Sequence, residues 1–351
     1  MKALIRAAVL VAAASLALGA CSSGGDEDSA SDDTNGGGSG AGGTVAVAYD
    51  LGGRGDGGFN DLAYAGAKAA ADAQGAEVTE STAKETDTDE DRAARLELLA
   101  QSGADPVVTV GYLYATALNE VAPKYPDTWF AIVDDATVEQ PNVAALTFAA
   151  NEGSFLVGAV AALESESGKV GFIGGVDTPL INEFEAGFLA GAEAANPEVD
   201  VSTSYLTQPP DFAGFNDPTR GKESANGQYD SGVDIVFAAA GGSNAGVFDA
   251  ANGAGAKVIG VDSDQYDTTE APLNEVIVSS MLKRVDVGVQ TFIESVADGS
   301  VEAGERRFDL STEGVGYSTS GDLLSEETIA AVDELAAQIR SGDITVPTTV
   351  E

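Results

Sequence analysis

Residues 45–73 read VAVAYDLGGRGDGGFNDLAYAGAKAAADA, and this stretch contains a whole strand–loop–helix unit. Residues 45–49 are apolar at every position, which is typical of a strand buried on both faces of a parallel sheet. A glycine-rich loop over residues 50–60 follows, and residues 61–73 are rich in alanine, a strong helix former. A buried strand followed by a loop and a helix is the repeating unit of parallel α/β folds, so this stretch predicts the fold class.

The same alternation recurs along the chain as far as residue 261. Further strand candidates cover residues 106–110, 129–133, 144–148, 170–173, 235–239 and 258–261, and helix candidates cover residues 91–101, 152–163, 183–195 and 244–254. Roughly ten such units are too many for one small sheet, so we predict an α/β fold of two doubly wound, parallel-sheet lobes.

The two lobes are expected to be joined by several crossovers rather than by a linker. No second low-complexity segment interrupts residues 44–351, and a helix candidate opens after Phe148, near Asn151. We therefore expect lobe 1 at about 44–148 plus a later return segment, and lobe 2 at about 149–280 plus the C-terminal segment.

Residues 1–20 predict a lipoprotein signal peptide. Lys2 and Arg6 precede an apolar run over residues 7–20, which is too short to span a bilayer but suits the core of an export signal. The run ends in Leu18-Gly19-Ala20-Cys21, which resembles a bacterial lipobox, and Cys21 is the only cysteine of the chain. We expect Cys21 to be lipidated and to anchor the protein in the cell membrane, facing outside the cytoplasm; the alternative is an ordinary export signal with a chance cysteine.

Residues 22–43 carry acidic, glycine and serine residues and no bulky apolar side chain. Such a segment has nothing to bury and is typical of a flexible tether. With Cys21, it forms the predicted link between the membrane and the folded domain.

Composition excludes several classes of function. The chain of 351 residues has no His and one Cys, which rules out Ser-His-Asp triads, His-ligated metals and disulfide bonds. Its 57 Asp and Glu against 17 Lys and Arg give a formal charge of −40, which repels nucleic acid. We expect no metal and no cofactor.

The glycine-rich loops mark where a ligand is expected, because ligands of open α/β folds bind beyond the carboxyl ends of the strands. Asp50 ends the first strand and is placed to accept hydrogen bonds from ligand hydroxyl groups. Taken alone, Phe59 suits a hydrophobic staple and Asn60 suits a helix N-cap. Gly241 and Gly242 open a helix whose free N–H groups can meet polar ligand atoms.

Acidic residues elsewhere allow two other interpretations. Asp262 ends another strand; in isolation it suits an ordinary strand-end acid and Lys283 a surface lysine, whereas taken together the two allow an ion pair lining a cleft. The run Asp87, Asp89 and Asp91 suggests calcium, but the glycine and glutamate that an EF-hand requires are replaced by Arg92 and Leu98, so a solvated helix start is the expectation.

Several stretches, read in order, resemble the basic-membrane-protein family of bacterial lipoproteins, which includes purine-nucleoside receptors that feed ABC transporters. The matching stretches are 57–60 (GGFN), 151–158 (NEGSFLVG), 168–175 (GKVGFIGG), 184–188 (FEAGF), 228–230 (QYD), 240–242 (AGG), 260–265 (GVDSDQ), 280–286 (SMLKRVD), 314–316 (GVG) and 341–347 (SGDITVP). The resemblance covers nearly all of residues 44–351.

This resemblance implies a type I periplasmic-binding-protein fold that closes on its ligand. It also implies a set of ligand-binding residues. Phe59 and Phe215 would sandwich a purine base and Asn60 would hydrogen-bond it, the ribose hydroxyls would meet Asp50, Asp262 and Lys283, and Tyr112, Gly241 and Gly242 would complete the site.

The chain departs from the family pattern at two places. Many relatives carry an acidic residue shortly after the third strand, where this chain has Thr116, which leaves the base preference open. Residues 208–213 lengthen the loop before Phe215, so Phe212 is an alternative to Phe215 as the second aromatic face.

We therefore predict a lipid-anchored substrate-binding protein that captures a nucleoside, with a purine as first choice, for an ABC permease and its ATPase. The negative charge favours a neutral ligand. The alternatives are a binding protein for another neutral ligand, such as a simple sugar, and a hydrolase that uses paired acids such as Asp262 and Asp264. We expect no enzymatic activity.

Overall fold

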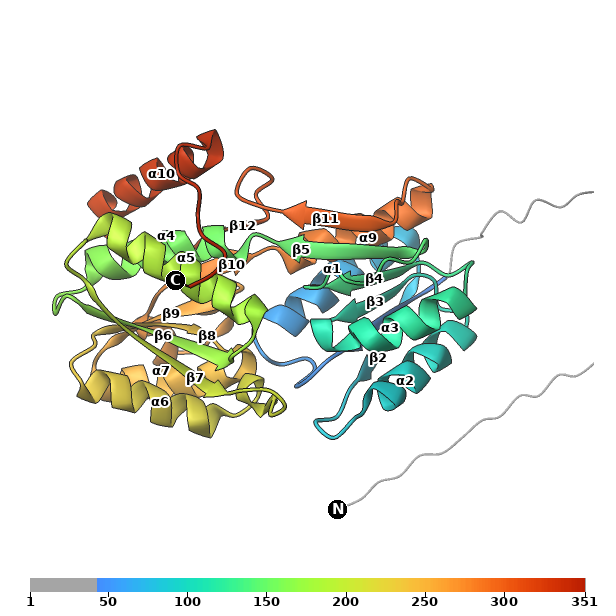
Figure 1. The fold of residues 1–351 in the computed structure, drawn as a ribbon, viewed down its shortest axis with the longest axis horizontal. Helices are drawn as coiled ribbons and strands as arrows, with labels where there is room; N and C mark the ends of the chain where they lie inside the picture. The colour runs from blue at the N-terminus through green and yellow to red at the C-terminus, as the bar shows by residue number, and fades with distance from the viewer. Residues whose placement is uncertain (1–42, 351) are drawn as a thin grey trace, which may run out of the picture. The chain divides into compact units, whose positions relative to one another are not determined.

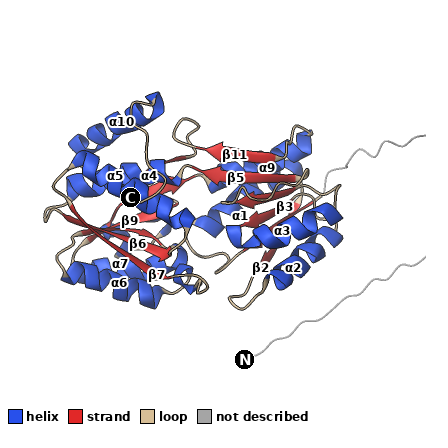
Figure 2. Cartoon of the chain, in the orientation of Figure 1, coloured by secondary structure: helices blue, strands red, loops and turns tan. Residues whose placement is uncertain are grey.

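The structure, a computed structural model, describes residues 43–350. The predicted signal peptide, Cys21 and nearly all of the predicted tether lie outside the described residues. Within them the chain forms two six-stranded sheets with helices on both faces, so the predicted two-sheet α/β fold is confirmed (Figures 1 and 2).

The first sheet is parallel throughout and has the strand order β11-β5-β4-β3-β1-β2. Its two central strands are fully buried and consist of Val, Ile, Ala and Phe apart from Thr109, whose hydroxyl donates to the Ala131 carbonyl, as expected for a parallel sheet covered on both sides. Its strands are β1 Thr44–Tyr49, β2 Glu77–Thr82, β3 Val107–Val110, β4 Phe130–Val133, β5 Val143–Phe148 and β11 Gly304–Phe308, and its helices are α1 Phe59–Gln74, α2 Asp89–Gln101, α3 Ala115–Val121 and α9 Val285–Asp298.

The second sheet has the order β12-β10-β9-β8-β6-β7, with only β12 antiparallel to its neighbour. Its strands are β6 Lys169–Val176, β7 Asp200–Thr207, β8 Ile235–Ala239, β9 Lys257–Asp262, β10 Ile277–Lys283 and β12 Val315–Tyr317. The remaining helices are α4 Ala150–Glu164, α5 Pro179–Ala195, α6 Pro218–Asp230, α7 Asn244–Ala254, α8 Gln265–Thr268 and α10 Glu326–Ser341.

The chain passes between the two sheets from β5 to α4, from β10 to α9 and from β11 to β12. We call the part built on the first sheet lobe 1 and the part built on the second sheet lobe 2. Because two of these crossings leave the carboxyl ends of β5 and β10, the crossovers lie close to the strand ends where ligands of such folds bind.

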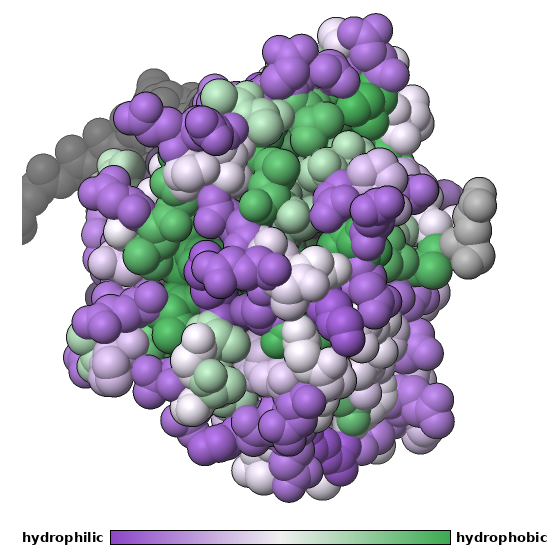
Figure 3. Space-filling view, turned by 90° about the vertical axis from the view of Figure 1, so that its left-hand side faces the viewer, coloured by the Kyte–Doolittle hydropathy of each residue, from purple (hydrophilic) through white to green (hydrophobic). Residues whose placement is uncertain are grey.

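The surface is strongly polar. Figure 3 shows the end of the molecule formed by lobe 2, where hydrophilic side chains cover much of the face and apolar strips lie between them. Among residues 43–350, no helix combines the length and the apolar character needed to cross a bilayer.

Helices α4 and α5 pack so closely that glycines are required between them. A Cβ atom on Gly191 of α5 would lie 1.9 Å from the carbonyl oxygen of Phe155 in α4, and one on Gly158 would lie 2.2 Å from that of Phe188. The two helix backbones therefore touch directly, and any side chain at these positions must push them apart.

We expect Gly191→Ala to lower the melting temperature, because the overlap is with backbone and overpacking of this kind costs on the order of 2 kcal/mol. Gly227→Ala on the exposed side of α6 is the control: nothing lies within 4 Å of its Cβ position, so better helix propensity should raise stability by up to about 1 kcal/mol. Thermal unfolding by circular dichroism measures both. A Gly191→Ala protein as stable as the Gly227→Ala protein would contradict the packing argument.

Candidate functional site

A cavity of about 440 Å³ lies at the carboxyl ends of strands from both sheets. All nine residues predicted to bind a ligand line it: Asp50, Phe59, Asn60, Tyr112, Phe215, Gly241, Gly242, Asp262 and Lys283. Its volume is in the range of small-molecule binding sites. The tertiary structure thus brings together residues that span more than 230 positions of the sequence.

Asp50 sits directly after β1, and its carboxylate is almost fully buried. It fits because residue 111 is a glycine: a Cβ atom there would lie 2.8 Å from Oδ2 of Asp50. Nη2 of Arg92 lies 3.7 Å from its Oδ1, and both Arg92 and the backbone N–H of Leu113 favour the charged form. Burial raises the pKa of Asp50 to about 7, and Arg92 opposes this shift. The charged form of Asp50 therefore lowers the stability of the folded protein.

The start of α1 differs from the prediction. Its N-cap is Gly58, so the expectation that Asn60 caps the helix is wrong. The side chain of Asp56 accepts hydrogen bonds from the N–H groups of Gly58, Asn60 and Asp61 and so satisfies the helix N-terminus. The Asn60 side chain is therefore free to line the cavity; its Nδ2 donates to the Leu51 carbonyl at 3.3 Å, and its buried Oδ1 has no hydrogen-bond partner among residues 43–350.

Lys283 is buried, but its ion-pair partner is not the predicted one. Its Nζ lies 2.5 Å from Oδ2 of Asp134, which follows β4 in the other lobe, whereas Asp262 is not within ion-pair distance in the described residues. Nζ also lies 4.8 Å from the centre of the Phe59 ring and 5.5 Å from that of Phe184. Lys283 is thus held by a carboxylate from one direction and by aromatic rings from others.

The sequence analysis missed Asp134, although the rule that singled out Asp50 and Asp262 applies to it. It is an acid at the end of a buried strand, and like Asp262 it adopts a left-handed backbone conformation, with φ of 66°. Phe184 and Ile181 of α5 were also missed as lining residues, because a helical apolar pattern does not tell which residue reaches a cavity.

Asp262 ends β9 with φ of 67° and is 7% exposed. Burial raises its pKa to about 7; Lys283 opposes this shift, and Asp134 and Asp56 add to it. Its neighbour Asp264 does not line the cavity, and Oδ2 of Asp264 accepts hydrogen bonds from the hydroxyls of Ser318 and Ser320. The two acids therefore do not act on a common ligand as a hydrolytic pair would.

Lobe 2 contributes an aromatic face and a glycine turn. Phe215 lines the cavity, whereas Phe212 does not; the Phe212 ring instead meets that of Tyr112 edge-on, with centres 6.4 Å apart. Gly241 has φ of 55°, and a Cβ atom on it would lie 3.0 Å from the Phe215 carbonyl oxygen. The glycine turn thus allows the Phe215 loop to lie against it.

Tyr112 reaches the cavity from the loop after β3, but Thr116 does not line it. The Tyr112 hydroxyl is buried and has no hydrogen-bond partner in the described part of the chain. Burial raises the pKa of Tyr112 to about 12, so the phenol stays protonated and can both donate and accept.

The two lobes also meet beside the cavity through the first loop. The carbonyl oxygen of Gly57 accepts hydrogen bonds from the hydroxyls of Ser263 and Thr268, which follow β9 in lobe 2. These contacts hold the glycine-rich loop of lobe 1 against lobe 2.

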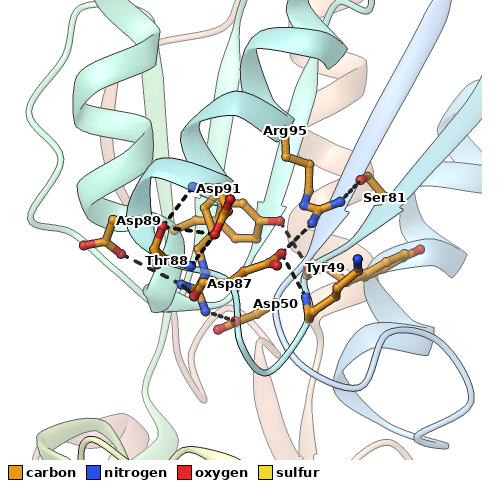
Figure 4. A network of polar contacts seen from close by, with 11 residues as sticks. Tyr49, Asp50, Ser81, Asp87, Thr88, Asp89, Asp91 and Arg95 are labelled. Carbon is orange, nitrogen blue, oxygen red and sulfur yellow. Dashed lines mark hydrogen bonds and ion pairs between the residues drawn. The ribbon is translucent and has the colours of Figure 1, made fainter.

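The acidic run at residues 87–91 forms a helix start and not a calcium loop (Figure 4). Thr88 is the N-cap of α2, its Oγ1 accepts from the N–H of Asp91, and Asp91 accepts from the N–H of Thr88. Asp87 pairs with Arg95. Residues 43–350 contain no cluster of three or more acidic side chains arranged to hold a metal ion.

Comparison with known proteins gives a consistent result. A family model described as "ABC transporter substrate-binding protein PnrA-like" matches residues 44–349. The CD4+ T-cell-stimulating antigen of Listeria monocytogenes is 36% identical over 325 residues, which cover 87% of this chain and 88% of that protein. An uncharacterized lipoprotein of Pyrococcus horikoshii is 36% identical over 78% of this chain and 68% of its own.

A protein of Lactococcus lactis named ABC transporter nucleoside-binding protein BmpA is 31% identical over 70% of this chain and 72% of its own. Among solved structures, an ABC transporter solute-binding protein from Aeropyrum pernix superposes with a TM-score of 0.77 at 30% identity and covers 88% of this chain and 94% of its own.

We expect Asp262→Asn to stabilise the protein at pH 8. The folded state holds the Asp262 proton more tightly than the unfolded chain, so the wild-type residue costs stability as pH rises from 3.8 towards about 7. Asparagine tolerates the left-handed backbone and carries no charge. The gain in melting temperature over wild type should shrink as the pH is lowered to 4.

Asp264→Asn is the matched control, because it weakens two hydroxyl hydrogen bonds outside the cavity and should lower the melting temperature at pH 8. Scanning calorimetry of the ligand-free proteins at pH 4, 6 and 8 makes the comparison. A lower melting temperature of Asp262→Asn than of wild type at pH 8 would show that the Asp262 carboxylate does not destabilise the folded protein.

Proposed function

The chain belongs to the Bmp family of ABC transporter substrate-binding proteins, and we propose that the ligand it captures is a nucleoside, most readily a purine nucleoside. The observation that carries this proposal is the set of side chains that line the cavity of about 440 Å³. Aromatic rings of Phe59 and Phe215 from opposite lobes line it together with the carboxylates of Asp50 and Asp262. The name of the Lactococcus lactis relative supports the same ligand class.

The side chains suit the two halves of a nucleoside. Aromatic rings offer flat apolar faces on which a base can stack. Carboxylates accept hydrogen bonds from the vicinal hydroxyl groups of a ribose, and a lysine that is paired with an acid donates a hydrogen bond to a hydroxyl oxygen. The unpartnered amide oxygen of Asn60 and hydroxyl of Tyr112 would meet polar atoms of the base.

Charge favours the nucleoside over its phosphates. The cavity is lined by Asp50, Asp56, Asp134 and Asp262, against Arg54 and Lys283. The chain as a whole carries a formal charge of −40. A phosphate group would be repelled both by the acids that line the cavity and by the negative charge of the whole chain, so we infer that nucleotides are excluded.

Membership of the family supports binding without turnover. The hydrolase alternative relied on Asp262 and Asp264 as a pair of acids. Only Asp262 lines the cavity, since Asp264 accepts hydrogen bonds from serines away from it. We propose that the protein delivers its ligand to an ABC permease and its ATPase, and that lipidated Cys21 holds it on the outer side of the cell membrane.

We expect Phe59→Ala and Phe215→Ala each to weaken nucleoside binding at least tenfold. Stacking on one aromatic face contributes about 1–3 kcal/mol, and the middle of that range, about 2 kcal/mol, exceeds the roughly 1.4 kcal/mol that corresponds to tenfold. Phe212→Ala is the control, because its ring lies outside the cavity lining. Isothermal calorimetry with adenosine, inosine and guanosine measures the affinities.

A thermal-shift screen of residues 22–351 against nucleosides, bases, nucleotides and simple sugars should precede the titrations. Saturation at 100-fold above Kd stabilises by about 2.7 kcal/mol, which such a screen detects. A shift with sugars and none with nucleosides would replace the proposal by the sugar alternative. Release of free hypoxanthine from inosine would indicate a hydrolase.

We expect Cys21→Ser to release the protein from the membrane fraction into the medium. Two acyl chains on one cysteine anchor stably, since each buried CH₂ contributes about 0.8 kcal/mol. Fractionation of cells expressing the wild-type and Cys21→Ser chains measures this, with Ser22→Ala as the control beside the lipidation site. Retention of Cys21→Ser with the membrane would contradict the lipid anchor.

A further inference from the structure

A buried arginine lies behind the cavity wall that Asp50 forms. Arg92 belongs to the first turn of α2, is 7% exposed, and does not line the cavity. Its Nη2 lies 3.7 Å from Oδ1 of Asp50. No group in the described residues donates a hydrogen bond to this oxygen. A ligand in the cavity would meet Asp50, and Asp50 would have Arg92 on its other side.

The position of Arg92 is set by the helix start around it, whose residues Asp87, Thr88 and Asp89 are labelled in Figure 4. Its Nη1 donates to the carbonyl oxygen of Asp87 at 2.9 Å and lies 3.9 Å from Oδ1 of Asp89. The capping of α2 by Thr88 and the ion pair between Asp87 and Arg95 hold that segment in place. The acidic run that resembles a calcium loop thus serves to seat a buried guanidinium.

We propose that Arg92 is a positioning residue, which holds the Asp50 carboxylate in place and in its charged form for a hydroxyl group of the ligand. This inference rests on the proposed function, since it assigns Arg92 a part in nucleoside binding without contact to the nucleoside.

The groups around Asp50 leave this task to Arg92. From α2 the carboxylate faces Arg92, and from the segment after β3 it faces the Leu113 N–H and the phenols of Tyr112 and Tyr114. Burial raises the pKa of both phenols, so they carry no charge at neutral pH. The positive charge that acts on Asp50 in the described structure therefore comes from Arg92.

The consequence of losing Arg92 follows from the sign of its effect. Burial raises the pKa of Asp50 to about 7 while Arg92 lowers it. Without the guanidinium the pKa rises further, and Asp50 is mostly protonated at pH 7. A neutral carboxyl is a weaker acceptor for a ligand hydroxyl than a carboxylate is, so affinity should fall at pH 7 and recover as the pH is raised.

The test is the pH profile of nucleoside affinity for Arg92→Met beside Lys124→Met. Both replace a cation that pairs with an acid of α2, Asp89 or Glu97, but Lys124 is exposed and only Arg92 faces Asp50. With adenosine and inosine as probes, we expect Arg92→Met to lose about tenfold in affinity at pH 7 and to regain most of it by pH 9, a charge-assisted bond being the interaction lost. Lys124→Met should keep the wild-type profile.

Further variants separate positioning from a merely structural role. Arg92→Lys keeps the charge and should keep the wild-type pH midpoint. Arg92→Gln removes the charge but still carries an N–H donor for the Asp87 carbonyl, and it replaces Arg92→Met if that chain does not fold. In an Asp50→Asn background, Arg92→Met should cause no further loss of affinity. Asp262 also has a raised pKa, but it is common to all these proteins and cancels in the comparison.

The outcomes distinguish the two proposals. Folded wild-type protein that binds neither nucleoside at any pH overturns the proposed function. Wild-type protein that binds, with Arg92→Met losing as much affinity in the Asp50→Asn background as in the wild type, or showing an unshifted profile, overturns the role of Arg92 alone.

Discussion

The buried ion pair between Lys283 and Asp134 joins the two lobes beside the cavity, and the remaining charges of the site are arranged around it. Lys283 ends β10 in lobe 2, and Asp134 follows β4 in lobe 1. Because removal of one partner of such a pair costs about 3–5 kcal/mol, both must be present for either to be buried. The pair occupies the lysine. Asp50, Asp56 and Asp262 also line the cavity without a close cation in it, and of these Asp56 is engaged by the N–H groups at the start of α1.

This arrangement stores free energy at the site. Asp134 and Asp262 both hold left-handed backbone conformations, which are unfavourable for residues other than glycine and cluster at functional sites. Burial raises the pKa of Asp50 and of Asp262 to about 7, so each costs stability in its charged form. Hydroxyl groups of a bound ligand would replace the lost solvation. The same groups that weaken the empty protein are therefore those that favour a filled one.

The rest of the fold supplies rigid surroundings for these groups. Two parallel sheets present their carboxyl ends to one cavity, and the backbones of α4 and α5 touch through glycines. The segment before α2 is built from acidic residues that cap the helix and hold Arg92 and Arg95. The acidic residues of this segment thus have local structural uses, apart from the ligand preference proposed for the charge of the chain.

The sequence by itself determined the fold class, because buried strands and helices have different periodicities that are local in the chain. It also indicated Asp50, Asp262 and the glycine-rich loops, because strand ends are local features. It did not determine which charges pair. Lys283 meets Asp134 across 149 positions rather than the predicted Asp262, and Asp56 rather than Asn60 caps α1. Such contacts depend on the strand order and on the approach of the two lobes, both of which follow from the packing of the whole chain. Only the tertiary structure therefore decided which charged and polar groups of the site contact one another.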